Sequence, residues 1–413
     1  MKVLYVVGAC LTRNTSANMS HNAYIQGMIE NNCDIDIIME DESWGNEDET
    51  LKKYQECHYF EYKSLSLLEK VRNKFSYVKN QEKQAEITKK VDEFSSSEDN
   101  KKISIKAKIR NAVKNLYYSI FVSDSVYSLN KTWLRKASKF KSDKIYDLVV
   151  SNSSPAASHK LVDILLNKKN IKCKRWIQIW EDPWYYDIYG GLSEEVKIEE
   201  HNLLKSAQEV FYVSPLTLMY QKKYFSDCAE KMKCIPLPYL EYTDNSKKKT
   251  ISEVSFGYFG DYYSKTRNLK PFYEALVASN STGFIYGDSD ENFAATEKID
   301  LSGRVTLDKL SIIQDKTSVL VNLCNLKAGQ IPGKIYHYSA TNKPILFILD
   351  GTEDEVKAIL NYFSQFNRYY FCRNNVKDIC SSIELIKEEI NFKEYKPVEQ
   401  FNPKNVAELF LGS

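Results

Sequence analysis

Short apolar runs alternate with helical patterns along the whole chain. The first run, at residues 1–8, is unbroken after Lys2 and ends at a glycine, which is typical of a strand buried on both faces. A helix is expected at 18–31 and the next strand at 34–39. The alternation then returns, with strands predicted at 145–151, 175–180, 209–214 and 233–236 and helices at 155–167 and 193–206.

A polar stretch at 242–252 separates this series from a second one. The second series predicts strands at 254–259, 284–287, 318–323, 344–349 and 369–372 and helices at 268–279, from 333, at 353–363 and at 375–391. Alternating strands and helices predict parallel sheets whose ligand-binding edge lies at the carboxyl ends of the strands. The expected fold class is therefore α/β, with two tandem Rossmann-like, doubly wound domains at 1–245 and 246–413.

The segment 65–144 interrupts the alternation and is expected to be a helical insertion in the first domain. Apolar residues recur at steps of three or four within 105–120, and basic residues recur at steps of four within 102–114. Between 101 and 144 the chain has twelve basic and two acidic side chains. Two interpretations stay open: a basic helix packed on its own domain, or contact with anionic lipid or a lipid-linked substrate.

Composition, charge and missing motifs narrow the class of protein. The 413 residues exceed what one core usually serves, and a net charge of +2 gives no sign of nucleic-acid binding. None of the nine cysteines forms a C-x-x-C pair, so buried free thiols in a reducing compartment are expected. The sequence lacks G-x-S-x-G, P-loop, H-E-x-x-H and complete G-x-G-x-x-G motifs, which speaks against hydrolases, P-loop enzymes, zincins and dehydrogenases. No apolar run reaches the roughly 18 residues of a transmembrane helix.

Cations gather near predicted strand ends in the second domain. Gly333 precedes a predicted helix, so free amides and the Lys334 ammonium would favour an anion there, unless the glycine is ordinary helix capping. Arg267 follows the first strand of the domain, and its planar guanidinium suits phosphate oxygens; a surface salt bridge is the alternative. The loop with Arg304 and Val305 would either hold a base by its backbone groups or form a plain turn. A nucleoside diphosphate fits these charges.

The first domain also offers candidates near strand ends. Asp182 follows a buried strand and precedes a proline, and it would act as a base or orient a substrate; a common Asp-Pro turn is the alternative. Trp184 would stack on a sugar beside it. His21 is a second candidate, with a core or surface histidine as the alternative, and Gly8 either lets a loop approach the substrate or simply ends its strand. The acidic run within 194–200 is typical of a solvated helix face.

The order of several segments resembles bacterial GT-B glycosyltransferases, the large group-1, family-4-like class that uses nucleotide-activated sugars. In the second domain the resemblance is carried by Tyr258 to Leu269, by Gly303-Arg304-Val305, and by Pro332-Gly333-Lys334-Ile335-Tyr336 followed by Lys343-Pro344-Ile345. In the first domain the segments that look like members building surface polysaccharides are Tyr146 to Pro155 and Trp176 to Trp184.

The resemblance implies that a nucleotide diphosphate sugar binds the second domain, the acceptor binds the first, and the reaction occurs between them. Arg267 and Lys334 would neutralise the leaving diphosphate. Arg304 and Val305 would border the base, and the helix after Gly333 would face the phosphates. The implied enzyme is a retaining glycosyltransferase without metal or other cofactor, because its cations would stabilise the charge on the leaving group. Its acceptor would be a glycan or lipid-linked glycan of surface polysaccharide or capsule synthesis, reached in the cytoplasm or peripherally on the inner face of the plasma membrane.

The chain departs from this family at two positions. His337 stands where members usually have a glutamate that binds the ribose hydroxyls, and Gly329 stands where many have another. A histidine can still bond a ribose hydroxyl through one ring nitrogen. Two rival functions stay open. A sugar-nucleotide 2-epimerase of the same fold would need acid and base carboxylates in the cleft but no acceptor or membrane patch, and the basic insertion speaks against it. A non-catalytic partner of another transferase, which the missing glutamates favour, would bind no nucleotide.

Overall fold

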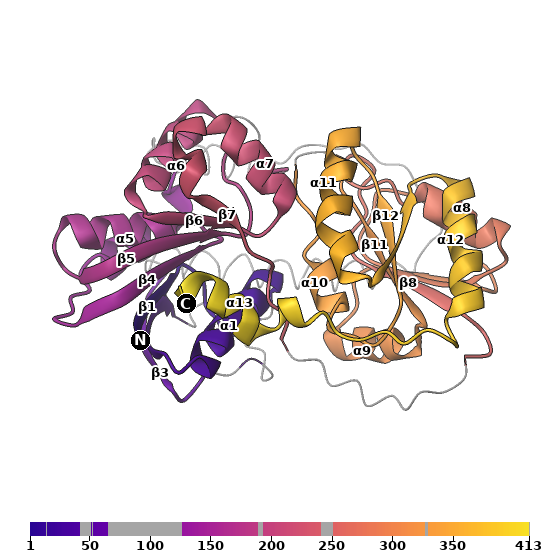
Figure 1. Cartoon of the computed structure of the whole chain (residues 1–413), viewed down its shortest axis with the longest axis horizontal. Helices are drawn as coiled ribbons and strands as arrows, with labels where there is room; N and C mark the ends of the chain where they lie inside the picture. Colours follow the sequence, from indigo (N-terminus) through magenta and orange to yellow (C-terminus); the bar gives the residue numbers. More distant parts are fainter. Residues whose placement is uncertain are drawn as a thin grey trace, which may run out of the picture.

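The structure is a computed structural model that describes residues 1–13, 15–41, 51, 53–64, 126–188, 193–240, 251–326 and 329–412. It has two lobes side by side, each built around one parallel sheet with helices packed on it (Figure 1). The two tandem α/β domains predicted from the alternation of apolar runs and helical patterns are therefore confirmed.

The centre of the first sheet is β1 (Lys2–Val7), which pairs with β2 (Asp34–Glu40) and β4 (Ile145–Ser153). Alternate residues of β1 enter two different buried cores, one on each face of the sheet. Covering both faces is the reason for the unbroken apolar run. The other strands are β3 (Cys57–Tyr62), β5 (Lys172–Trp180), β6 (Glu209–Tyr212) and β7 (Met232–Cys234), and the order is β3-β2-β1-β4-β5-β6-β7.

Several helices of the first domain begin at a residue whose side chain caps them. Thr15 accepts a hydrogen bond from the Asn18 amide at the start of α1 (Ser16–Glu30), and Ser214 caps α7 (Pro215–Tyr224), whose first residue is a proline. The other helices described in this domain are α4 (Lys131–Ala137), α5 (Ala157–Asn167) and α6 (Glu194–Ser206), with short 3-10 turns at Ser128–Asn130 and Ser226–Lys231.

The second sheet has the strand order β10-β9-β8-β11-β12-β13, with every pairing parallel. Its strands are β8 (Ser255–Phe259), β9 (Thr282–Tyr286), β10 (Ile299–Ser302), β11 (Val319–Leu323), β12 (Ile345–Leu349) and β13 (Tyr369–Arg373). Its helices are α8 (Lys270–Ala278), α9 (Leu307–Lys316), α10 (Lys334–Tyr338), α11 (Glu353–Phe363) and α12 (Val376–Glu389), with 3-10 turns at Ser364–Phe366 and Glu399–Phe401.

The last helix, α13 (Pro403–Leu411), returns to the first domain and lies against α1 (Figure 1). A Cβ on Gly27 would lie 2.0 Å from the carbonyl oxygen of Pro403, so only glycine allows this approach. Arg175 of β5 donates hydrogen bonds to the last carbonyls of α13. The end of the chain, which the sequence analysis assigns to the second domain, thus packs on the first. The boundary expected at 245 lies outside the described residues and stays a prediction.

The expected basic insertion falls mostly outside the described residues, because 65–125 are not among them. In the described remainder, Trp133, Leu134 and Ala137 of α4 are buried against the first domain. Lys144 forms an ion pair with the buried Asp36 at 2.8 Å. Among the helices that the structure describes, none is long and apolar enough to cross a membrane.

Candidate functional site

A cavity of about 950 Å³ opens at the carboxyl edge of the second sheet and is closed on one side by the start of α1 in the first domain. Four cationic side chains line it, and Asp261 is the single carboxylate among its described lining residues. We call this site the cationic cavity; its charged residues are Asp261, Arg267, Arg304, Lys334 and Lys343. Five residues predicted to bind the nucleotide sugar line it together: Arg267, Arg304, Val305, Lys334 and His337.

Lys334 is the first residue of α10, and its ammonium enters the cationic cavity. It forms no hydrogen bond or ion pair with any residue that the structure describes. Its side chain is open to the cavity yet crowded by protein on most sides, and this burial, together with the charge of Arg267, lowers its pKa to about 8. The charge of Asp261 acts in the opposite direction on this pKa, but Asp261 is already paired with Arg304, so an anionic ligand would supply the compensating charge that Lys334 lacks.

Arg267 follows β8 and is held by neutral groups. Its Nε donates to Asn325 Oδ1 at 2.7 Å and its guanidinium donates to the backbone carbonyl of Asp261 at 2.9 Å. No carboxylate of the described chain pairs with it, so the salt bridge that the sequence left open as an alternative is not found there. The guanidinium is therefore fixed in direction while its charge stays available to a ligand.

Arg304 differs from Arg267 in having carboxylate partners. It makes a bidentate contact with Asp261, and its Nε lies 3.5 Å from Asp288 Oδ2. Its side chain is 70% exposed. These pairs hold the pKa of Asp261 below its ordinary value and that of Arg304 above it, chiefly through their mutual hydrogen bonds. Arg304 thus lies at the mouth of the cavity with its charge already compensated.

His337 lines the cavity one turn of α10 after Lys334. Burial and the charge of Lys334 lower its pKa to about 4, so the imidazole is neutral at pH 7 and offers one donor and one acceptor. Val305 lines the same cavity from the loop before α9. Both positions match the roles that the resemblance implies for ribose and base, and these roles stay predictions.

Gly333 is placed differently from the expectation. It is absent from the described lining of the cationic cavity, and a Cβ on it would lie 3.2 Å from the side chain of Leu237. The helix that it precedes, α10, has only five residues, so its dipole is weak. That the helix after Gly333 faces the phosphates stays a prediction; the observed positive charge at this end of α10 is the Lys334 side chain, which lines the cavity.

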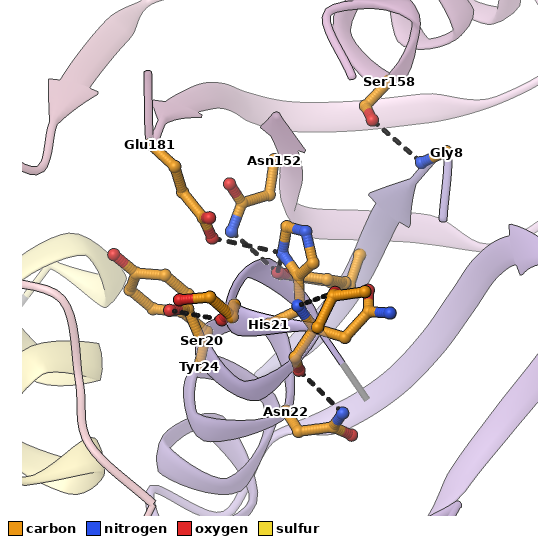
Figure 2. Close-up of polar contacts among 12 residues, drawn as sticks. Gly8, Ser20, His21, Asn22, Tyr24, Asn152, Ser158 and Glu181 are labelled. Carbon is orange, nitrogen blue, oxygen red and sulfur yellow. Dashed lines mark hydrogen bonds and ion pairs between the residues drawn. The ribbon is translucent and has the colours of Figure 1, made fainter. Parts of the chain in front are cut away.

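A second polar group lies at the carboxyl edge of the first sheet (Figure 2). Asn152 donates to the Tyr5 hydroxyl at 2.8 Å, and this hydroxyl lies 3.1 Å from His21 Nδ1. The tautomer of His21 decides whether the Tyr5 hydroxyl donates to Nδ1 or accepts from it. His21 Nδ1 also lies 3.5 Å from Glu181 Oε1. We call these four side chains the edge cluster: Tyr5, His21, Asn152 and Glu181.

Burial favours the uncharged forms of His21 and Glu181 in the edge cluster. Burial lowers the pKa of His21 to about 3, against the smaller effect of a hydrogen bond with the backbone of Ser154. Burial also raises the pKa of Glu181 well above its ordinary value, and the neighbouring Asp182 raises it further. The His21 side chain has no exposed surface, so the structure places this candidate catalytic residue in the core, where it touches no solvent-filled cleft. The core histidine that the sequence left open as an alternative is the observed one.

Asp182 reaches across to the second domain, although it does not line the cationic cavity. Its Oδ1 accepts a hydrogen bond from Gln330 Nε2 at 2.5 Å, and the same nitrogen donates to Asp187 at 3.1 Å. The side chain is open to water yet densely surrounded, as expected inside an interdomain cleft. Burial and the charge of Asp187 raise the pKa of Asp182, and the bond from Gln330 acts in the opposite direction.

Two other first-domain candidates serve packing in this structure. The Trp184 ring is half-buried and lies 5.2 Å from the Tyr127 ring. A Cβ on Gly8 would lie 2.9 Å from the Pro155 ring and 3.2 Å from Trp133, and the Gly8 amide donates to Ser158. Gly8 therefore allows close packing of its own domain, and no substrate approach is needed to explain it.

Three polar residues near the domain interface or the edge cluster are not predicted from the sequence: Glu181, Gln330 and Glu200. Glu181 is adjacent to the chosen Asp182 but points to His21, and Gln330 bridges the domains. Glu200, assigned to a solvated helix face, is fully buried and accepts a hydrogen bond from the Tyr185 amide at 2.5 Å. Burial raises its pKa to about 8. The only signal in the sequence for Glu181 is its position at a strand end, which Asp182 shares.

Side chains that could together hold a metal ion lie elsewhere in the described chain. The two groups are His201-Asp227-Cys228 and Asp34-Asp36-His58. Neither lines the cationic cavity, and each has an acidic member already paired with a lysine, Lys205 or Lys144. That the site needs no metal stays a prediction.

Solved structures match the chain over nearly its full length, whereas no protein-family model and no curated protein sequence matches it. Sucrose-phosphate synthase from Thermosynechococcus elongatus aligns with 99% of this chain and 94% of its own, at 12% identity and a TM-score of 0.52. HepE from Anabaena, solved in complex with UDP and glucose, aligns with 99% of this chain and 95% of its own, at 10% identity and a TM-score of 0.52. At these identities the likeness shows the fold alone, and the GT-B fold expected from the sequence is confirmed.

Proposed function

We propose that the protein is a glycosyltransferase that moves a sugar from a nucleotide diphosphate sugar to a glycan or lipid-linked glycan. The observation that carries this proposal is the pair of cations in the cationic cavity, Lys334 and Arg267, neither of which forms an ion pair with a carboxylate of the described chain; the nearby Asp261 is already paired with Arg304. A diphosphate supplies the two negative charges that such a pair favours. The likeness in fold to HepE, solved with UDP-glucose, supports the same class of ligand.

In the proposed reaction the bond between the sugar C1 and the diphosphate oxygen breaks, and its electron pair stays on the diphosphate. Lys334 and Arg267 would stabilise that charge as it develops, in a site that is already organised for it. The acceptor hydroxyl would bond to C1 and lose its proton. Asp182 is proposed to orient this hydroxyl or to take the proton, because a carboxyl with a raised pKa is a stronger base than a free one. Neutral His337 would bond the ribose.

The finer features of the proposal rest on the resemblance seen in the sequence. They are retention of configuration, charge stabilisation without a metal ion, and an acceptor of surface polysaccharide or capsule synthesis. The proposed location is the cytoplasm, with peripheral binding to the inner face of the plasma membrane through the basic segment 101–144. A membrane contact of this segment would follow from its twelve basic side chains.

A specific observation also favours the rival sugar-nucleotide 2-epimerase. Such an enzyme needs acid and base groups in the cleft, and the one carboxyl of the first-domain edge that reaches the domain interface there, Asp182, has a raised pKa, while its neighbour Glu181 is turned to His21. Gly329 and His337 stand where members of the resembling family usually have glutamates. The absence of these glutamates would favour the second rival, a non-catalytic partner of another transferase.

A thermal-shift panel with UDP, GDP, ADP, dTDP and CMP, on wild type and Lys334→Ala, tests the proposal. A ligand at 100 times its Kd stabilises the native state by about 2.7 kcal/mol, which is measurable. We expect one diphosphate to raise the melting temperature of wild type and to lose most of that effect in the variant. Incubating the corresponding nucleotide sugar with and without a glycan acceptor then separates transfer from epimerisation. No shift with any nucleotide would overturn the proposal in favour of the non-catalytic protein.

A further inference from the structure

The segment from Asp182 to Ile188 leaves the first sheet after β5 and is hydrogen-bonded to a side chain of the second domain, Gln330. Both the nitrogen and the oxygen of the Gln330 carboxamide form hydrogen bonds with this segment. Its Nε2 donates to Asp182 and Asp187, and its Oε1 accepts from the Ile188 amide at 2.9 Å. This orientation of the amide follows from chemistry, because its carbonyl oxygen would otherwise face two carboxylates.

The same segment is fastened on the first-domain side at Tyr185. The Tyr185 amide donates to Glu200 Oε2 at 2.5 Å, and the Tyr185 carbonyl accepts from Gln221 at 3.0 Å. Both Glu200 and Gln221 are fully buried. The two carboxylates, Asp182 and Asp187, therefore project from a fixed backbone, and Gln330 alone of the described residues reaches both.

Gln330 is also tied to the cationic cavity by one intermediate, Asn325. Asn325 Nδ2 donates to the backbone carbonyl of Gln330 at 2.9 Å, and its Oδ1 accepts from Arg267 Nε at 2.7 Å. Asn325 is buried, so these bonds are shielded from water. Arg267 and Asp182 thus belong to one chain of hydrogen bonds that crosses the domain interface.

The neighbouring Gly329 holds this loop in place. Its φ is +65°, and a Cβ on it would lie 2.4 Å from the Tyr220 ring, so a larger residue would be strained and would clash. Its carbonyl accepts hydrogen bonds from Thr217 at 3.0 Å and Ser214 at 3.4 Å. The residue that replaces the usual family glutamate thus allows a close contact with α7.

We propose that Gln330 is a positioning residue that couples occupancy of the diphosphate site at Arg267 to the placement of Asp182 in the cleft. This inference rests on the proposed function, because it takes the anion that binds Arg267 to be a nucleoside diphosphate. A phosphate that engages Arg267 orders Asn325 and the backbone of Gln330, and the carboxamide then holds Asp182 and the Ile188 amide more tightly. By linkage, a chain that holds these groups also binds the anion better.

Hydrogen exchange at the Ile188 amide tests this coupling directly, with UDP and GDP as probes. Loss of one net hydrogen bond in Gln330→Ala should speed exchange of this amide by about three- to tenfold. In wild type a bound nucleotide should slow this exchange, and in Gln330→Ala it should leave it unchanged. The matched control is Gln365→Ala, which removes an amide that bonds only the Tyr362 carbonyl of its own domain among described residues.

A second set of variants, in which carboxylates and amides are interchanged, still tests the coupling if Gln330→Ala only destabilises the protein. Gln330→Glu sets a third carboxylate against Asp182 and Asp187 and should expose the segment to exchange more than alanine does. Adding Asp182→Asn and Asp187→Asn to Gln330→Glu restores the hydrogen bonds with donor and acceptor exchanged, because the new amides donate to the new carboxylate. The triple variant should therefore recover slow exchange at the Ile188 amide. If the triple variant stays unprotected, or if a nucleotide slows exchange equally in Gln330→Ala, the inference is wrong. If calorimetry detects no binding of UDP or GDP to wild type, the proposed function fails for these probes, and the coupling falls with it.

Discussion

The cationic cavity and the edge cluster both lie at the carboxyl ends of parallel strands, yet they treat charge in opposite ways. In the cationic cavity, Arg267 and Lys334 form no ion pair with a described carboxylate, and the one carboxylate nearby, Asp261, is paired with Arg304. In the edge cluster, burial lowers the pKa of His21 and raises that of Glu181, so both shifts favour the uncharged forms. The edge of the second sheet thus presents positive charge toward a cavity, whereas the edge of the first sheet buries its titratable side chains.

The difference follows from exposure and not from topology. Lys334 and Arg267 extend from short loops and a five-residue helix into a cavity, where an anion can reach them. His21 belongs to α1, a long helix whose packing on α13 and β1 leaves it no surface. The carboxyl edges of two similar parallel sheets can therefore differ. One edge can expose charged side chains to a ligand, and the other can bury a hydrogen-bond network of uncharged groups.

Reversing the charge of Lys334 should give the largest effect. In Lys334→Glu a charge-assisted bond to the diphosphate is lost and a carboxylate is added beside Asp261, so affinity should fall more than about 100-fold. Isothermal calorimetry with the diphosphate that stabilises wild type measures this. Lys377→Glu changes the same charge on α12 and serves as the control. Affinity within threefold of wild type in Lys334→Glu would remove the cationic cavity from nucleotide binding.

The two arginines should differ in effect because their partners differ. Arg267→Ala removes a guanidinium without a described carboxylate partner and should weaken diphosphate binding by about 10- to 100-fold. Arg304→Ala removes an exposed guanidinium that Asp261 and Asp288 already compensate, and should cost at most about threefold. Equal losses of affinity for the two variants would show that the Arg304 guanidinium breaks its contact with Asp261 and binds the ligand instead. The same titrations on both variants decide between these outcomes.

The alternation of strands and helices was predictable because strands covered on both faces need continuous apolar runs. β1, β8, β11 and β12 are strands of this kind, and the sequence predicts each of them within a few residues. The strands β3 and β10 lie at sheet edges, are half solvated and carry no such run, so they were not predicted. The return of α13 to the first domain depends on contacts far apart in sequence, which no local pattern records.

For the site, the sequence predicts which residues lie near strand ends. It does not predict how deeply each side chain is buried. Arg267 and Lys334 were found because cations after strands of a parallel sheet meet at one edge. Glu181 and Asp182 are neighbours at the end of β5, where successive side chains point in opposite directions. The choice between them depends on which side faces the cleft, and only the packed structure shows that Glu181 turns to His21 and Asp182 to Gln330.

The charge of Lys334 should make diphosphate affinity depend on pH in a defined window. Its lowered pKa of about 8 means that the ammonium is largely present at pH 7 and lost above pH 8, so affinity should fall by up to about tenfold per pH unit there. Asp261 and Arg304 do not titrate in this range, because the pKa of the first is lowered and that of the second raised. Calorimetry between pH 7 and pH 9.5 measures the fall. Lys334→Arg should abolish it, and an unchanged slope in that variant would assign the titration to another group.

Glu181 should give the smallest effect, and one of opposite sign. Because its pKa is raised in the folded protein, the unfolded chain loses this proton first as pH rises above about 4.5, so the native state becomes less stable between that pH and the folded pKa. Glu181→Gln is neutral in both states and should therefore stabilise the protein at pH 7.5 by roughly 1 kcal/mol, with the gain shrinking at pH 5. Thermal unfolding at both values, with the surface variant Glu297→Gln as control, measures the difference. A variant less stable than wild type at pH 7.5 and equally stable at pH 5 would show that Glu181 is ionised, and the edge cluster would then carry charge as the cationic cavity does.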